Sequence, residues 1–344
     1  MEYKGKFKIF DTKDIKTYPV ENRVSKVKIQ DLKDPSVYIK QVFEETQDTV
    51  EKIRKLSKKL IEFRQNGRPV IIFTGAHLVK NGLGPVLIDL VKRKLVTLIA
   101  SNAAAVIHDF ELALIGRTSE DVPQVLGKGQ FGMAFEFNYI NKALEIGDTY
   151  ELGFGEVIGK FISEESFSKK VASELAINEN IVFKYPGTSL LANCYKENIP
   201  FTVHAGIGTD VIDQHYTFNG RYKGGCSGRD FLIFVNEITK FAHGGMILNI
   251  GSAVTGPEVV LKAVSMACNT GKKPKDFLIA DFDIRDDHSE DVSDQCSDHY
   301  YFRDQKSLIY RIPRSFGGQG VYVKGDQRAT LPLLYKNILE DLKG

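Results

Sequence analysis

Residues 70–109, VIIFTGAHLVKNGLGPVLIDLVKRKLVTLIASNAAAVIHD, decide the fold of this chain. The stretch opens with an apolar, β-rich run, Val70–Phe73, which ends at Thr74-Gly75-Ala76. A helical stretch, Gly82–Lys94, leads to a second apolar run that ends at Ser101-Asn102. This order predicts a strand–helix–strand unit with small and hydroxyl-bearing residues after both strands. Because ligands bind at the carboxyl ends of strands in open parallel sheets, the stretch predicts an α/β ligand-binding protein.

The rest of the chain alternates in the same way. Further strands are expected at 201–205, 246–250, 277–283, 308–312 and 321–324, and helices at 50–63, 104–115, 164–179, 189–197, 230–242, 256–269 and 328–342. Such alternation predicts one α/β domain, with an open, mostly parallel, Rossmann-like sheet and helices on both faces. We expect residues 1–45 to form a mostly extended N-terminal arm and 46–344 to form the domain. The glycine- and aromatic-rich residues 117–160 show no clean period, and we interpret them as an insertion or lid.

Composition narrows the class of protein. The chain has 344 residues, a net charge of +2 and no basic block, so neither nucleic acid nor an anionic membrane is expected as a partner. An apolar leader is not evident in MEYKGKFKIF, and no long apolar run occurs, so we expect a soluble cytoplasmic protein. The four cysteines form no CxxC pair and are expected to be free thiols.

Four segments match the motifs of one enzyme family in order. They are HLVKNGL at 77–83, SNAAAVIHD at 101–109, Thr209-Asp210 after HAGIG, and YVKGDQRATLPLL at 322–334. Across residues 47–340 this order resembles deoxyhypusine synthase, an NAD-dependent enzyme that moves an aminobutyl group from spermidine to a protein lysine. The resemblance implies an NAD cofactor, a small amine substrate such as a polyamine, and a homotetramer with sites at subunit interfaces.

In that family the matching loops bind NAD. The resemblance, with the small-residue turns at the strand ends, indicates ten cofactor contacts: Gly75, Ala76, Ser101, Asn102, Ala103, Thr209, Asp210, Gly251, Ser252 and Asp326. Carboxylates accept hydrogen bonds from ribose hydroxyls, and small residues let backbone donors approach a pyrophosphate. Alternatively, Asp210 and Asp326 cap helices or turns. An ordinary Rossmann fingerprint, GxGxxG, is absent from the sequence.

Two departures from the family limit what the resemblance implies. The family uses a Trp-Gly-Lys lysine to form an imine, but this chain has no tryptophan, and Ile312–Gly320 contains no lysine. Lys306 and Lys324 flank that stretch, and neither is expected to form the imine. Where the family has a His-His pair, this chain has Pro257-Glu258. We therefore expect an NAD-dependent enzyme that oxidises or transfers a small amine, without true deoxyhypusine synthesis.

Four residues are the catalytic candidates: Asp213, His215, His108 and Glu258. Asp213 and His215 follow the Thr-Asp turn, and His108 follows the second strand, so each can serve as a general base or a cation partner. Glu258 can instead be a carboxylate favoured by its place in the first turn of a helix. His204 alternates within a strand and is expected to be a hydrogen-bonded core or rim group.

Two alternatives remain open. The first is a non-catalytic NAD- or nucleotide-binding protein of the same fold. The second is a metal-dependent hydrolase that uses the stretch Asp281–Asp304, where His288, Cys296 and His299 accompany many aspartates. The spacing matches neither an EF-hand nor a zinc site, so no metal ligand is assigned and a solvated loop is favoured.

Overall fold

Six strands form one parallel sheet in the computed structural model, which describes residues 3–343. The strand order is β5-β3-β2-β6-β7-β8, and every neighbouring pair is parallel. The strands are β2 (Val70–Thr74), β3 (Leu98–Ser101), β5 (Phe201–Val203), β6 (Gly245–Ile250), β7 (Phe277–Asp283) and β8 (Gln319–Lys324). The predicted α/β fold with an open parallel sheet is confirmed.

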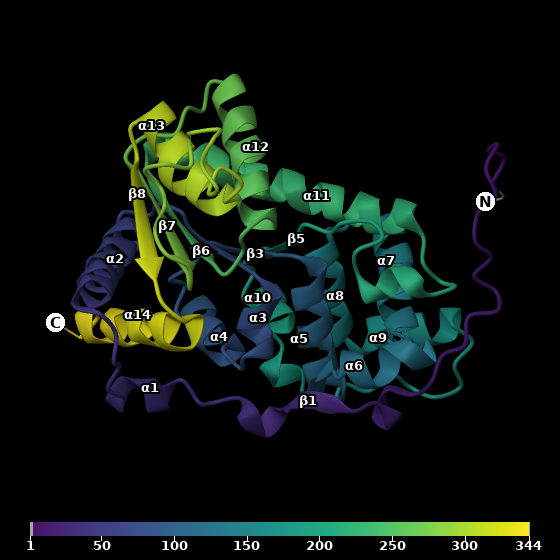
Figure 1. Ribbon diagram of the computed structural model, residues 1–344. Coiled ribbons are helices and arrows are strands. Elements are labelled where there is room, and N and C mark those ends of the chain that lie inside the picture. Colours follow the sequence, from purple (N-terminus) through teal and green to yellow (C-terminus); the bar gives the residue numbers. More distant parts are fainter. Residues whose placement is uncertain (1–2, 344) are drawn as a thin grey trace.

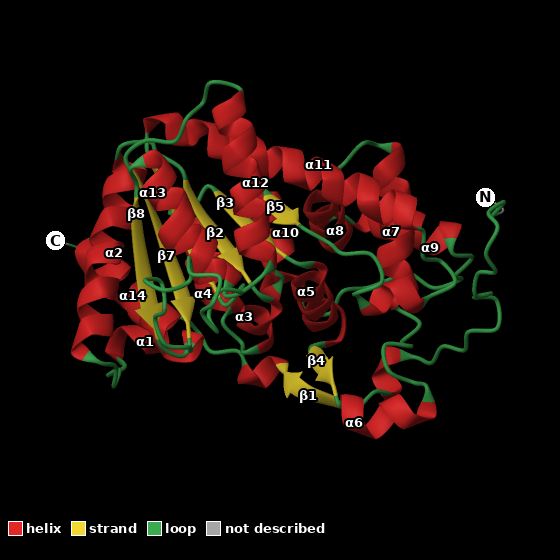
Figure 2. Ribbon diagram, turned by 45° about the horizontal axis from the view of Figure 1, so that its top comes forward, coloured by secondary structure: helices red, strands yellow, loops and turns green. Residues whose placement is uncertain are grey.

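Helices cover both faces of this sheet (Figures 1 and 2). One face packs on α2 (Gln47–Gln65), α4 (Gly84–Lys92), α5 (Ala103–Ile115) and α14 (Gln327–Asp341). The other packs on α11 (Gly220–Thr239), α12 (Thr255–Asn269), the π-helix η7 (Gln305–Arg311) and α13 (Ile312–Phe316). In β7, Leu278 and Ala280 enter the first core while Phe277 and Ile279 enter the second. Burial on both faces explains why these strands read as continuous apolar runs.

The interpretation of residues 117–160 as an insertion or lid is wrong for the second half of the stretch. That half forms packed helices beside the sheet, α7 (Phe137–Thr149) and α8 (Phe154–Ser163), followed by α9 (Glu165–Glu174) and α10 (Leu190–Lys196). The glycines of these two helices are packing positions: a Cβ on Gly155 would lie 1.7 Å from the carbonyl oxygen of Phe201. Glycines that let α8 approach β5 resemble loop glycines when only the sequence is read.

One further prediction needs correction. The expected strand 308–312 is helical: Leu308 and Ile312 lie four residues apart, and both contribute to the second core. The expected helix 82–94 corresponds to α4. A short helix that was not predicted, α3 (Ala76–Lys80), precedes it, and Gly82, whose φ is +78°, lies between the two.

The N-terminal segment runs along one side of the molecule (Figure 1). Its strand β1 (Ser25–Lys28) pairs antiparallel with β4 (Arg117–Glu120). The remaining short elements are η1 (Val20–Asn22), η2 (Ile29–Asp31), α1 (Ser36–Lys40), α6 (Val122–Val125), η3 (Leu126–Lys128), η4 (Pro186–Thr188), η5 (Val211–Gln214) and η6 (Lys240–His243). All four cysteines are free thiols, as expected. Between residues 3 and 343, no helix is long and apolar enough to cross a membrane.

Candidate functional site

The chain changes direction across the sheet between β2 and β6. β2 leads to α4 on one face, whereas its neighbour β6 leads to α12 on the other, so a topological switch point lies between them. Gly75 and Gly251 meet there: a Cβ on Gly75 would lie 2.2 Å from the carbonyl oxygen of Gly251. The Gly75 N–H donates to the carbonyl oxygen of Ile250 at 3.1 Å. Gly75 therefore allows close packing of the two loops, and its N–H already has a partner.

A cavity of about 420 Å³ opens at the carboxyl ends of β6, β7 and β8. We call it the strand-end pocket. Its polar lining comes from separate loops and includes His77, Asp283, Arg285, Asp326, Gln327 and Arg328, beside the backbone of Gly251. The volume lies within the roughly 300–1,000 Å³ that is typical of small-molecule sites. Two of the predicted cofactor residues, Gly251 and Asp326, are thus brought together.

The strand-end pocket pairs carboxylates with guanidinium groups. Arg285 donates to Asp283 at 2.9 and 3.0 Å, and Arg328 donates to Asp326 at 2.6 Å. The Arg328 guanidinium holds the pKa of Asp326 below its usual range. The side-chain oxygen of Gln327 is buried and has no hydrogen-bond partner within residues 3–343. The pocket therefore offers acceptors for hydroxyl or amide groups and, through its arginines, donors for phosphate.

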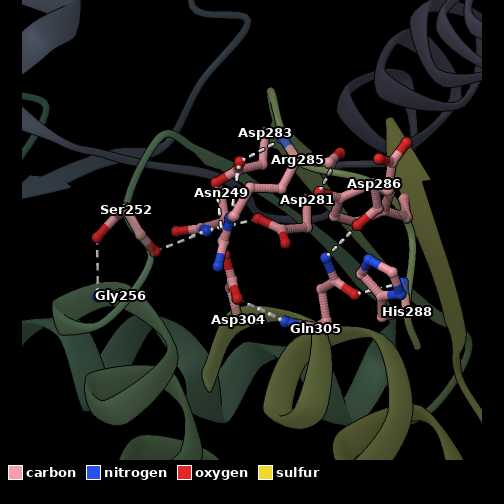
Figure 3. A network of polar contacts seen from close by, with 11 residues as sticks. Asn249, Ser252, Gly256, Asp281, Asp283, Arg285, Asp286, His288, Asp304 and Gln305 are labelled. Carbon is pink, nitrogen blue, oxygen red and sulfur yellow. Dashed lines mark hydrogen bonds and ion pairs between the residues drawn. The ribbon is translucent and has the colours of Figure 1, made fainter. Parts of the chain in front are cut away.

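Arg285 lies in a network of polar contacts that is partly buried in the core (Figure 3). Asn249 donates to Asp281 at 2.7 Å, and Arg285 joins Asp283 to Asp304. Burial raises the pKa of Asp281 well above its usual value, and the nearby charge of Asp304 raises it further. Asp281 and Asp304 are 1% and 0% exposed, so these ends of the predicted solvated loop are core groups that join β6, β7 and η7.

A second cavity of about 300 Å³ lies beside α5, and we call it the α5 cavity. His108, Glu111, Glu120, Thr209 and Asp210 line it with Arg23 and Lys80. The short helix α3 contributes to both cavities, since Lys80 lines the α5 cavity and His77 lines the strand-end pocket. Five of the predicted site residues line these cavities: His108, Thr209 and Asp210 line the α5 cavity, and Gly251 and Asp326 line the strand-end pocket.

The N-terminal segment places a guanidinium in the α5 cavity. Arg23 forms a buried ion pair with Glu111, and Thr118 also donates to Glu111. Nδ1 of His108 lies 2.7 Å from the Thr118 hydroxyl oxygen. Burial lowers the pKa of His108, which favours the neutral imidazole that a general base requires.

Asp210 and Asp213 share a buried lysine behind the wall of this cavity. Nζ of Lys223 lies 2.7 Å from Asp210 and 2.6 Å from Asp213, and it also donates to the carbonyl oxygen of Gly206 at 2.7 Å. Lys223 is 1% exposed. Burial raises the pKa of Asp210, and Lys223 opposes that shift. Both carboxylates therefore already have a cation partner.

The other two catalytic candidates lie apart from His108. His215 is buried behind Phe137, a residue that lines the α5 cavity, and its Nε2 lies 2.8 Å from the carbonyl oxygen of Gly132. Burial lowers the pKa of His215. Glu258 lies in the first turn of α12 and pairs with Lys262 and Arg303, and Lys262 lowers its pKa. This placement agrees with the alternative that Glu258 is a carboxylate favoured by the helix dipole.

Several predicted cofactor residues have structural partners. Ser101 donates to the carbonyl oxygen of Thr74 at 2.7 Å, and Asn102 caps α5 by accepting from the Ala105 N–H. Ser252 accepts from the N–H of Gly256 in the first turn of α12. Ala76 and Ala103 begin α3 and α5. Asp210 and Asp326 stand at helix N-caps, which agrees with the capping alternative for both residues.

Sequence reasoning missed several residues of the two cavities and their walls. His77, Arg285 and Gln327 line the strand-end pocket, Glu111 lines the α5 cavity, and Lys223 holds the wall of the latter. The sequence position of Arg285 could have indicated a site residue, because it follows the carboxyl end of β7 by two residues. Nothing in the sequence around Lys223 indicates its buried ion pairs, since a lysine in a polar stretch is normally exposed.

No family model matches this chain, and no curated protein matches it in sequence. Among solved structures, the chain is similar to AgrE in a ternary complex with ornithine and NAD+, at 14% identity and a TM-score of 0.48, over 88% of this chain and 35% of that one. It is similar to a proposed LOR/SDH protein from Methanococcus maripaludis S2, at 16% identity and a TM-score of 0.43, over 88% and 72% of the two chains. A proposed deoxyhypusine synthase from Entamoeba histolytica matches at 11% identity and a TM-score of 0.38, over 95% and 97%.

These likenesses include the family whose motifs the sequence resembles. The chain spans about a third of the AgrE chain. Identities this low and TM-scores below 0.5 assign no activity, so the function must come from the residues of this chain.

Proposed function

We propose that this chain binds a nicotinamide dinucleotide, NAD, in the strand-end pocket and acts on a small amine. The observation that carries the proposal is the meeting of Gly251, Asp326 and two arginines at the carboxyl ends of β6, β7 and β8. A pocket beside the switch point of an open α/β sheet is where nucleotides bind in such folds.

The residues present fit the chemical groups of NAD. Asp283 and Asp326 supply acceptors for ribose hydroxyls, while Arg285 and Arg328 supply donors for the pyrophosphate. Gly251, with φ of +64°, and Gly325, with φ of +153°, allow the backbone to turn close to the ligand. The unpartnered oxygen of Gln327 accepts a hydrogen bond from a hydroxyl or a carboxamide.

The α5 cavity is the proposed amine site. Glu120 is the carboxylate of its lining that pairs with no cation within residues 3–343, since Glu111 pairs with Arg23 and Asp210 with Lys223. His108 is the group that can accept a proton from the amine. NAD, when bound, accepts a hydride from the carbon next to the nitrogen. Lys306, which flanks the stretch expected to carry an imine-forming lysine, donates to the carbonyl oxygen of Tyr300 and is 1% exposed. Lys324 pairs with Asp286. These contacts favour oxidation over a covalent aminobutyl relay.

Calorimetry with the purified full chain tests the cofactor. We expect NAD and ADP-ribose to bind with one site per chain, and Gln327→Leu to weaken both. Gln65→Leu, at the exposed end of α2, is the matched control and should bind as the natural chain does. The absence of heat and of a thermal shift at millimolar NAD would refute the proposed cofactor. Formation of NADH across a panel of diamines and polyamines then tests the reaction.

A second candidate function is non-catalytic nucleotide binding. It is favoured by Arg23, which places its own cation against Glu111 in the α5 cavity, and by Lys223, which occupies Asp210 and Asp213. NAD binding without turnover of any amine would select this candidate. A homotetramer also remains a prediction, and a monomer in light scattering would contradict it.

A further inference from the structure

The loop between β7 and η7 brings together three side chains that the proposed function does not use. His288, Asp291 and His299 each offer one ligand atom, and these atoms all lie within 4.8 Å of one another. The imidazole rings of His288 and His299 stack with centroids 3.5 Å apart and 10° between their planes. Nδ1 of His299 lies 3.2 Å from a carboxylate oxygen of Asp291.

These three side chains have the chemistry and the spacing of a metal site. Imidazole nitrogen and carboxylate oxygen are ordinary ligands of zinc and related divalent ions. With metal–ligand bonds of about 2.0–2.1 Å in a tetrahedron, neighbouring ligand atoms lie roughly 3.3 Å apart. The ligand atoms are already close to this spacing, although the stacked rings of His288 and His299 must tilt apart for both nitrogens to point at one ion. Three protein ligands leave one position for water. We propose that residues 284–304 bind one divalent transition-metal ion, zinc by the ligand set, through His288, Asp291 and His299.

The backbone of the loop holds the first two ligands in place. The His288 N–H donates to the side-chain oxygen of Gln305 at 2.7 Å, and the Gln305 amide donates to the carbonyl oxygen of Asp286 at 2.8 Å (Figure 3). The Val292 N–H donates to the carbonyl oxygen of His288 at 3.2 Å and closes a turn, and the side chain of Val292 is fully buried. Asp291 lies within this turn, so His288 and Asp291 are attached to η7 and the core.

The third ligand comes from a separate turn. The His299 N–H donates to the hydroxyl of Ser297, and the carbonyl oxygen of His299 accepts from the Phe302 N–H at 2.9 Å. The ring of Phe302 contacts both imidazoles, at centroid distances of 5.9 and 5.2 Å. A bound ion would thus cross-link two turns whose other hydrogen bonds are mainly local, and the site would fix the conformation of the loop.

Charge in the same loop favours a cation over an anion. Asp287, Glu290, Asp294 and Asp298 are all exposed around the three ligands. The metal-free alternative is that the stacked imidazoles and the His299–Asp291 contact hold the turns together unaided. The two cases differ in one measurable respect, the dependence of loop order on added zinc.

Titration of zinc into the chelator-treated full chain tests the proposal. We expect one equivalent to bind, and His299→Ala to weaken binding by more than the roughly 10–100-fold that follows loss of an outer partner of a metal ligand. His288→Ala with His299→Ala should abolish binding. Zinc should also protect residues 284–304 of the natural chain, and not of the double variant, from limited proteolysis.

Matched controls come from the same loop and from elsewhere. Glu290→Gln and Cys296→Ser alter exposed residues of the loop, and His243→Ala removes an exposed histidine of η6. All three should bind zinc as the natural chain does. Urea midpoints of the metal-free variants show whether each has folded. Failure of the natural chain to bind zinc, or equal binding by a folded double variant, would overturn the proposal. Loss of binding in Cys296→Ser would overturn the assigned ligand set.

Discussion

The imidazole of His204 stacks on the ring of Phe73, with centroids 5.4 Å apart and 25° between the planes. Phe234 packs edge-on against the same imidazole, and Thr202 hydrogen-bonds to its Nε2 at 3.2 Å. The expectation that His204 is a hydrogen-bonded core or rim group is confirmed. Desolvation lowers the pKa of His204 to about 3.

This depressed pKa predicts acid sensitivity. The unfolded chain takes up a proton on His204 near pH 6.5 and the folded chain does not, so the free energy of unfolding falls as the pH drops from about 6.5 towards 3. The limiting slope for one proton is about 1.4 kcal/mol per pH unit. His204→Phe should reduce the slope measured by urea unfolding at several pH values. Thr202→Val loses the hydrogen bond but keeps the imidazole, so it should be less stable at every pH with the slope unchanged. An unchanged slope in His204→Phe would refute the assignment.

The close contact between Gly75 and Gly251 predicts that adding one methyl group at Gly75 lowers the stability of the protein. Gly75→Ala places a Cβ 2.2 Å from a backbone oxygen, so β2 and β6 must shift apart at the switch point. We expect a loss of about 1–3 kcal/mol in the free energy of unfolding, together with weaker NAD binding. Gly84→Ala is the control, because its Cβ meets nothing within 4 Å and the residue begins α4. That change should be neutral or slightly stabilising. Equal urea midpoints for the two variants would contradict the argument.

The buried Lys223 predicts a large loss of stability. Lys223→Met leaves the carboxylates of Asp210 and Asp213 without their cation, at side-chain exposures of 8% and 4%. Removing one partner of a buried ion pair costs about 3–5 kcal/mol. Lys262→Met breaks an exposed pair with Glu258 and should change stability by about 0.5 kcal/mol or less. Adding Asp210→Asn to Lys223→Met should recover part of the loss. Additive losses in that double variant would show that Lys223 and Asp210 do not interact.

The sequence predicted the sheet well because strands buried on both faces are long apolar runs. The run 277–283 has the same bounds as β7, and the run 246–250 misses only the first residue of β6. The prediction failed where one pattern has two causes. Leu308 and Ile312 belong to an apolar run that suits a strand, but η7 and α13 place both on one side of a helix.

The candidate site was harder to predict, because a residue type does not reveal its partner. Asp210 and Asp326 lie at loops where ligands bind, yet Asp210 is paired with Lys223, thirteen residues later in the chain. Asp326, in contrast, lines an open pocket. The sequence spacing of the two aspartates gives no sign of this difference, since it arises from the packing of α11 beneath the 206–213 loop.

Asp326 has both a capping role and a proposed binding role, and variants at this position can distinguish them. Its carboxylate accepts from the Arg328 N–H at 2.8 Å and caps α14, and the same group lines the strand-end pocket. Asp326→Ala should cost about 1 kcal/mol of stability through the lost cap. It should also raise the Kd for NAD by at least about tenfold, which corresponds to about 1.4 kcal/mol.

Two variants separate these effects in the same pair of measurements, urea unfolding and calorimetry. Thr46→Ala removes the cap of α2, which accepts from the Thr49 N–H at 3.2 Å, so it should lose similar stability and keep the affinity for NAD. Asp326→Asn retains a good capping group and one acceptor oxygen, so its stability should be nearly natural and its affinity intermediate. If Asp326→Ala lost stability while binding NAD as tightly as the natural chain, Asp326 would be a helix cap alone, and the pocket would have to hold the ribose through Asp283.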